Sequence, residues 1–434
     1  MLLVVLAAIG APALALRVLC VGNTCTASSS EQPRVPFCPL PTDLKAAIAN
    51  GFREGRSADV LAVTEVTTPV AGPTRAGPGL VAWPSAATAT DVPLVFAGVG
   101  VSDGPVELPP GTTLDQVAPT VASIAGLERP FPEVRSGTAL EGFAADAGPR
   151  LILLVAWKGV GSEAFDADAQ ARPFVSGLLA SGAGTTAADT GSVPLDPAAV
   201  LTTIGTGGLP SQHGITGALV RNDEGSVVPA FGAGAPVTVI ATLADDLEGA
   251  SRGRALVGLV APERSDQGIV GGGWYPDEDP PAVILEDGGG VPDAVEALLE
   301  AGLGSDAVTD ILAVVLDGSL RSMDARTRRI VTEVERATGG STLTVVVGTG
   351  GTAPSGSTPA VDLLAAVEAA VPGERPVVEA AVAGGLFLDQ TVLEEQRITG
   401  RVVVEALLDA ETADGERMVA DAFQGFAVSF ARYC

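Results

Sequence analysis

Short, almost continuously apolar segments alternate with helical segments along most of the sequence, and this alternation constrains the fold more than any other feature. Segments of this length and character are typical of strands that are covered on both faces of a sheet. The predicted strands are 59–64, 93–101, 151–157, 236–241, 255–260, 311–316 and 343–347, and the predicted helices are 41–55, 113–127, 166–181, 291–302, 322–337 and 359–371. Strands and helices in this order predict an α/β fold with a mostly parallel sheet covered by helices on both faces.

Three segments between these elements are rich in residues that favour turns and loops. Residues 21–36 are rich in Ser, Thr and Pro, and we expect a linker there. Residues 67–91 are rich in Gly, Pro and Thr and predict a long loop, which the apolar segment 79–83 interrupts. Residues 128–149 combine Pro, Gly and Arg and form a candidate boundary.

The N-terminal segment is apolar from residue 2 to residue 16. It is short for a membrane-spanning helix, which needs roughly 20 residues, but it has the length of a signal-peptide core. The Ala-Leu-Ala sequence at 13–15 offers a cleavage site, although no basic residue precedes the apolar segment. A buried core element is the alternative. We predict that residues 1–17 are a signal peptide or a membrane anchor, and that the protein is exported.

The four cysteines agree with export, because an even number of cysteines outside the cytosol is typical of disulfides. They are Cys20, Cys25, Cys38 and Cys434. Four cysteines allow three pairings, and the sequence does not choose between them. We expect Cys434, the last residue, to be tied to the N-terminal group. The spacing of Cys20 and Cys25 does not fit a zinc site.

Composition excludes several functions. The chain has 52 acidic and 25 basic residues, for a formal net charge of −27, which argues against binding nucleic acids or anionic lipid surfaces. His213 is the only histidine, so a site that needs two imidazoles from one chain is excluded. Lys45 and Lys158 are the only lysines.

The segment TTIGTGGLPSQHGITG at 202–217 resembles a motif of the alkaline phosphatase superfamily, in the branch of type I phosphodiesterases and nucleotide pyrophosphatases. Residues 151–159, 311–337 and 343–351 resemble strands and a helix of the same family. Residues 93–127 resemble its closing strand and helix, so the order of segments looks permuted. On this resemblance we divide the chain into the leader 1–17, a Cys-containing linker 18–40, a segment 41–147 like the family's C-terminal part, and a main α/β domain 148–434.

The resemblance implies a site with two metal ions and a Ser or Thr nucleophile, but the matching positions carry other residues. The metal-binding Asp after the first strand falls on Lys158, and the later Asp-His pair falls on Thr349 and Gly350. The nucleophile falls on Leu195 or Pro197, depending on gap placement.

The motif at 202–217 matches the family at structural positions, not at positions that bind metal. Within it, Ser211, His213 and Gly214 correspond to positions that the family uses structurally, so His213 is not expected to bind metal. Residues 317–325, which match a loop that bears histidine in the family, contain none.

Lys158 could instead bind an anion, since an ammonium at a strand end is a point charge with three donors. Thr202, Thr203 and Thr349 would complete the pocket. The alternative is that Lys158 is an exposed loop lysine or pairs with a local carboxylate such as Glu163 or Asp166.

We therefore predict an exported or membrane-anchored protein with an alkaline-phosphatase-like fold and a degenerate catalytic site, which binds a small anion or an envelope protein and needs no cofactor. One alternative is a hydrolase of phosphate or sulfate esters, in which carboxylates such as Asp196 and Asp317 hold one Mg, Mn or Ca ion. A second alternative is a structural component of a membrane-associated complex, anchored through residues 2–16.

Overall fold

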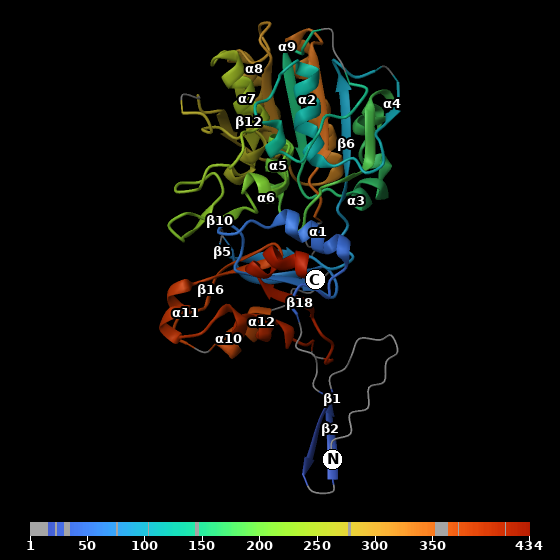
Figure 1. Ribbon diagram of the computed structural model, residues 1–434. Helices are drawn as coiled ribbons and strands as arrows, with labels where there is room; N and C mark the ends of the chain where they lie inside the picture. Colours follow the sequence, from blue (N-terminus) through green and yellow to red (C-terminus); the bar gives the residue numbers. More distant parts are fainter. Residues whose placement is uncertain are drawn as a thin grey trace.

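The computed structural model describes residues 16–21, 24–29, 35–74, 77–102, 104–143, 147–276, 279–351, 363–371, 373–412 and 414–434. They form a larger part built on one sheet and a smaller part built on another, and an N-terminal hairpin stands apart below the smaller part (Figure 1). The predicted leader lies outside the described residues except for its last two positions. Within the described ranges, no helix combines the length and apolar character that a membrane crossing requires.

The large sheet has eight strands in the order β13-β12-β14-β8-β15-β6-β9-β7. Their bounds are β6 Asp91–Gly98, β7 Val106–Glu107, β8 Leu151–Trp157, β9 Ala183–Asp189, β12 Val257–Ala261, β13 Ala282–Leu285, β14 Asp310–Leu316 and β15 Thr342–Gly348. The run from β13 to β15 is parallel, whereas β6 is antiparallel to both of its neighbours. The predicted mostly parallel sheet is confirmed.

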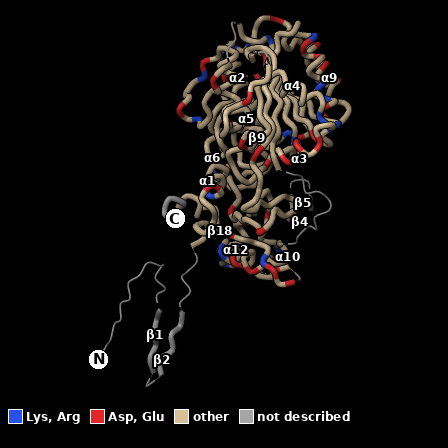
Figure 2. The backbone as a smooth tube through the Cα atoms, turned by 90° about the vertical axis from the view of Figure 1, so that its right-hand side faces the viewer, with Lys and Arg blue, Asp and Glu red and all other residues tan. Residues whose placement is uncertain are grey.

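Helices cover both faces of this sheet because alternate residues of each strand point to opposite faces. In β8, Ile152 and Leu154 belong to one core cluster, and Leu153 and Val155 belong to another. The first face is covered by α2 Val117–Ala125, α5 Pro197–Thr206 and α7 Leu243–Ser251, and the second by α4 Pro173–Ser181, α8 Val291–Glu300 and α9 Leu320–Thr338. Figure 2 shows that the charged residues lie around the sheet rather than on its central strands.

The smaller part contains a four-stranded sheet in the order β16-β17-β3-β18, with bounds Val378–Val382, Gly385–Leu388, Val60–Thr64 and Val419–Gln424. Helices α10 Leu363–Ala370, α11 Gln390–Gln396 and α12 Gly400–Leu408 pack on one face. Helix α1 Thr42–Gly51 packs on the other face and lies between the two parts (Figure 1). Since β3 pairs with C-terminal strands while β6 joins the large sheet, the boundary predicted at residue 148 does not separate the sheets.

Three predicted elements differ from the structure. Residues 236–241 are not a strand: the amide of Val239 donates to the carbonyl of His213, and no strand partner lies beside this segment in the described chain. The predicted loop at 67–91 contains an antiparallel hairpin, β4 Thr68–Thr74 and β5 Gly77–Trp83. The helix predicted at 166–181 is broken into α3 Ser162–Ala167 and α4, because Pro173 starts a new helix.

A disulfide between Cys38 and Cys434 joins the two ends of the folded region. Beside it, the ring of Phe37 packs edge-on against Phe423 at 5.0 Å, and the amide of Phe37 donates to the carboxylate of Asp421. The expected link between Cys434 and the N-terminal group is therefore confirmed. Cys20 and Cys25 lie opposite each other in the N-terminal hairpin of β1 Leu16–Val21 and β2 Thr24–Ser29, within the predicted linker.

Candidate functional site

The carboxyl edge of the large sheet is where ligands bind in folds of this kind. Strands β8, β14 and β15 are adjacent and parallel, so the residues that follow them meet at this edge. Those residues begin with Lys158, Asp317 and Thr349. The predicted site residues after these three strands are thus brought together at one edge.

Lys158 forms an ion pair that crosses the end of β14. Its backbone amide donates to the carbonyl of Leu316, and its ammonium reaches the loop after β12. There Nζ lies 2.9 Å from Oδ1 of Asp266 and 3.5 Å from Oε1 of Glu263. The expected local partners of Lys158 are wrong, since its carboxylates come from a distant segment. Asp166 instead pairs with Arg172.

Burial and the neighbouring charges shift the pKa values of both Lys158 and Asp266. The side chain of Asp266 is 1% exposed, and that of Lys158 is 17% exposed. Burial alone lowers the pKa of Lys158, but the attraction of Asp266, Glu263 and Asp196 outweighs it, so the pKa of the ammonium is raised. Burial raises the pKa of Asp266 to about 6, against the opposing effect of Lys158. At neutral pH the cluster is therefore an ammonium held by carboxylates.

Asp196 lies next to this cluster and begins helix α5. Its Oδ1 accepts the amide of Ala198 at 3.0 Å, which is the contact of an N-cap. Burial raises the pKa of Asp196, although hydrogen bonds from the amides of Ala218 and Ala198 favour the carboxylate. Asp196 thus has a capping role and also adds negative charge near Lys158.

The predicted threonines on α5 are buried and make internal hydrogen bonds. The hydroxyl of Thr202 donates to the carbonyl of Ala198 at 2.7 Å. The hydroxyl of Thr203 lies 3.1 Å from Nε2 of His213, whose Nδ1 accepts the amide of Ile215. Because Nδ1 is an acceptor, the proton of the neutral ring is on Nε2 and is donated to Thr203.

His213 is fully buried at the end of the short helix α6 Pro210–His213, and burial lowers its pKa to about 3. Gly214 follows in the left-handed region with a φ of 81°, and the carbonyl of Ser211 accepts from Arg53 at 2.7 Å. These three motif residues have the contacts of structural residues. The lone pair on Nδ1 is occupied by the amide of Ile215 and the ring is fully buried, so His213 is not placed to take a proton from a bound substrate.

The loop after β15 is also occupied by internal contacts. The hydroxyl of Thr349 accepts the amide of Gly159 at 2.9 Å, and Leu195 packs against Gly350 and Gly351. Anion binding by Lys158, Thr202, Thr203 and Thr349 stays a prediction.

Asp317, the last of the predicted residues, is half-buried after β14, and its backbone carbonyl accepts from Arg326. The residues at this edge do not fit a site for two metal ions, because the positions that match metal ligands carry Lys158, Thr349 and Gly350, and the ammonium of Lys158 lies among the nearby carboxylates. Within the described residues, no group of three or more His, Cys, Asp or Glu side chains is arranged to hold a metal ion.

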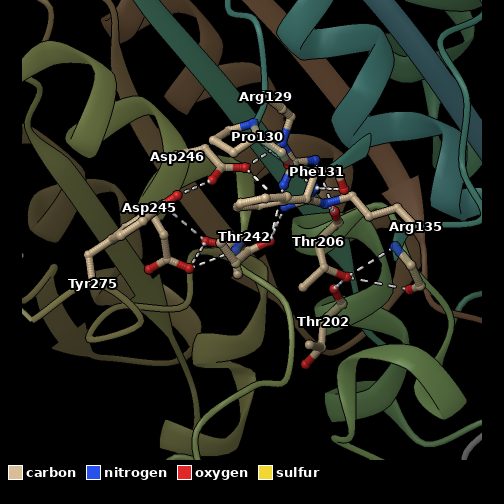
Figure 3. A network of polar contacts seen from close by, with 12 residues as sticks. Arg129, Pro130, Phe131, Arg135, Thr202, Thr206, Thr242, Asp245, Asp246 and Tyr275 are labelled. Carbon is tan, nitrogen blue, oxygen red and sulfur yellow. Dashed lines mark hydrogen bonds and ion pairs between the residues drawn. The ribbon is translucent and has the colours of Figure 1, made fainter. Parts of the chain in front are cut away.

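A second cluster of polar residues lies at the C-terminal end of α5 (Figure 3). Arg129 and Arg135 both bind Oδ2 of Asp246, at 2.7 and 3.1 Å, and both donate to the carbonyls of Thr206 and Ala241. The hydroxyl of Tyr275 donates to the other oxygen of Asp246, and burial together with this carboxylate raises its pKa to about 12. The signal in the sequence is Arg-Pro-Phe-Pro-Glu-Val-Arg at 129–135, two arginines around a stiff turn.

A pocket of about 390 Å³ opens beside this cluster. Its lining includes two arginines, Arg53 and Arg135, and several apolar and aromatic residues, which are Pro130, Phe131, Val134, Val239, Ile240, Trp274 and Tyr275. This composition is typical of a binding pocket with a few polar groups in an apolar surface.

No model of a protein family matches this sequence, and no curated protein matches it. Among solved structures, the crystal structure of wild-type alkaline phosphatase PafA is similar, with a TM-score of 0.41 and 14% sequence identity. The match covers 64% of this chain and 84% of PafA. The α/β architecture is established by the strand order and helix packing of the chain itself. Membership in the superfamily that residues 202–217 resemble stays a prediction.

Proposed function

We propose that this chain is an exported binding protein without catalytic activity, in which an internal ion pair replaces the metal site of the family that it resembles. The observation that carries the proposal is the contact of 2.9 Å between Lys158 and Asp266 at the end of β8. The resemblance places a metal-binding Asp at position 158. In this chain position 158 is a lysine, whose ammonium lies where the resemblance would place a metal ion.

The groups around the pair support a binding role over hydrolysis. Leu195 and Pro197, the two candidates for the nucleophile position, are both apolar, and Leu195 packs on the loop after β15. The sole imidazole is neutral and hydrogen-bonded on both nitrogens. A divalent metal would have to displace a partly buried ammonium from the buried carboxylate of Asp266, and leaving one partner of a buried ion pair alone costs about 3–5 kcal/mol.

Export is supported by the disulfide between Cys38 and Cys434, because structural disulfides are rare in reducing compartments. Fractionation of the producing cells, with mass determination of the mature chain, tests this part of the proposal. We expect the protein outside the cytoplasm with its Cys38–Cys434 bond intact. A reduced, cytoplasmic chain would overturn it.

The catalytic part is tested with the purified full chain and a phosphate monoester, a phosphate diester and a sulfate ester. Each substrate is offered with Zn, Mn, Mg or Ca, and bound metal is measured in parallel. We expect rates no higher than those of the metal in buffer. Hydrolysis that is abolished by Asp196→Asn or Asp317→Asn would instead establish the carboxylate-based hydrolase.

A further inference from the structure

The turn at 129–135 holds an aromatic side chain in an exposed position that the backbone would not adopt unaided. Phe131 has a φ of 51°, in the left-handed region that non-glycine residues rarely enter, and its side chain is part of a residue that is 64% exposed. Such conformations persist where the surrounding structure enforces them, and they concentrate at functional sites.

The surrounding contacts enforce this conformation. Pro130 and Pro132 restrict the chain on both sides of Phe131. Nη1 of Arg135 donates to the carbonyls of Pro130 and Phe131, at 2.7 and 3.1 Å, and the same guanidinium is held by Asp246. Arg129 fixes the other end of the turn on Asp246 (Figure 3). The turn is thus a rigid support for one exposed ring.

Other exposed apolar side chains gather around Phe131. Val134 is 43% exposed and Val239 is 39% exposed, and both line the pocket with Phe131. Trp274 and Tyr275, packed edge to face with centroids 4.8 Å apart, line it as well. Exposed apolar patches of this kind mark interaction surfaces, and aromatic residues dominate the binding energy of such surfaces.

The charge of the pocket differs from that of the chain. Asp246 is the one carboxylate in the lining, and both of its oxygens are already bound by Arg129, Arg135 and Tyr275. Arg53 donates to the backbone carbonyls of Ser211 and Gln212, and within the described residues no carboxylate pairs with it. In a chain with a net charge of −27, this pocket therefore offers a guanidinium to an anionic group.

We infer that this pocket binds an extended segment of a partner protein that carries an aromatic or aliphatic residue next to one or two acidic residues. The apolar residue would pack between Phe131 and the Trp274–Tyr275 pair, and the acidic residue would bind Arg53. A longer acidic run is disfavoured because the rest of the chain repels it. This inference rests on the proposed binding role and names the partner's chemistry.

The test is selection of a displayed library of random peptides on the full, disulfide-bonded chain, followed by affinity measurement with the enriched peptides. We expect enriched sequences to share an apolar residue beside Asp or Glu. Phe131→Ala and Arg53→Gln should each weaken binding at least tenfold, whereas Phe426→Ala, which removes an exposed ring in the smaller part, should leave it unchanged. Val239→Ser, an exposed position in the same lining, is a second variant that does not disturb the 129–135 turn.

Several outcomes would overturn the inference: no enrichment, enriched peptides without acidic residues, or equal affinity for the Phe131→Ala variant. A dimer that Phe131→Ala dissociates in light scattering would assign the pocket to a second copy of the chain. Binding to phosphatidylcholine vesicles that Phe131→Ala abolishes would assign it to lipid. Each of these results leaves the ester-hydrolysis assay unaffected, so failure of the inference and failure of the proposed function are distinguishable.

Discussion

Lys158 and Asp266 lie 108 residues apart in the sequence, and their side chains meet in a buried ion pair across the end of β14. Lys158 follows β8 and Asp266 belongs to the loop after β12, so the pair spans the strand between them. The pair connects two loops at the edge of the sheet where ligands bind in related architectures. Its stability and its charge balance can both be measured.

Removing either partner alone should destabilise the fold more than removing both. Lys158→Met leaves two carboxylates without their cation, and Asp266→Leu leaves a partly buried ammonium without its nearest carboxylate, so each should lower the free energy of unfolding by about 3–5 kcal/mol. The double variant should lie much closer to the parent, because apolar residues can replace a buried pair at little cost. Urea unfolding of the four proteins measures this coupling. Strict additivity of the two single effects would contradict the pairing.

The same pair predicts a gain of metal binding. In Lys158→Ala, Asp266 and Glu263 lose their cation, and carboxylate oxygens are preferred ligands of Ca and Mg. Millimolar Ca or Mg should therefore raise the melting temperature of Lys158→Ala but not that of the parent protein. Lys158→Ala/Asp266→Asn is the matched control and should respond less. An equal response in the parent would show that the carboxylates bind metal with Lys158 in place.

His213 should make stability fall in acid. Its pKa is lowered from the ordinary 6.5 to about 3 by burial, so the unfolded chain binds a proton in this range that the folded chain does not. Stability from this group is complete above pH 6.5 and is lost as the pH falls toward 3, by about 1.4 kcal/mol per pH unit.

Comparing the parent with His213→Gln isolates the contribution of His213 to the loss of stability in acid. Asp266 acts in the opposite direction, because its pKa is raised to about 6 and its protonation favours the folded state as the pH falls. Asp266 is present in both proteins, so its effect cancels in the difference. The parent should lose stability more steeply than His213→Gln between pH 6 and pH 4 in urea unfolding. Parallel curves would mean that His213 is protonated in the folded protein.

The sequence predicted the elements whose patterns are local. Strands β8, β12, β14 and β15 are continuous apolar runs, and each was found from composition and length alone. Strand β9, with the sequence AGTTAAD, was missed because its residues are small and half-exposed. In residues 236–241 Val237 and Val239 are exposed while Thr238 and Ile240 are buried, so this segment packs one side on the protein without pairing as a strand.

Long-range pairings could not be predicted in this way. Strand β3 pairs with β18, whose residues follow more than 350 positions later, and no local signal identifies that partner. For the candidate site, the resemblance singled out Lys158, but the partners considered for it, Glu163 and Asp166, lie close to it in the sequence. Asp266 was not considered, because only the folded sheet brings the loop after β12 over β14.

Arg221 joins the two parts of the protein, and its removal should weaken that junction. It lies in β10 Leu219–Arg221, which pairs with β11 Val227–Pro229, and its guanidinium binds the carboxylate of Asp59 and the carbonyl of Leu388 in the smaller part. It also lies over the ring of Phe387, 5.4 Å from the centroid.

Arg221→Met keeps the apolar contact but removes the charge that balances Asp59, which also accepts the amide of Leu388. The side chain of Arg221 is only 12% exposed, so we expect a loss of about 2–4 kcal/mol in unfolding free energy. Arg375→Met is the matched control, because Arg375 pairs with Asp389 and Glu395 at 50% exposure and should contribute less than about 1 kcal/mol. Limited proteolysis should also cut Arg221→Met faster than the parent between the two parts. Equal stability of the two variants would show that the junction depends on apolar packing alone.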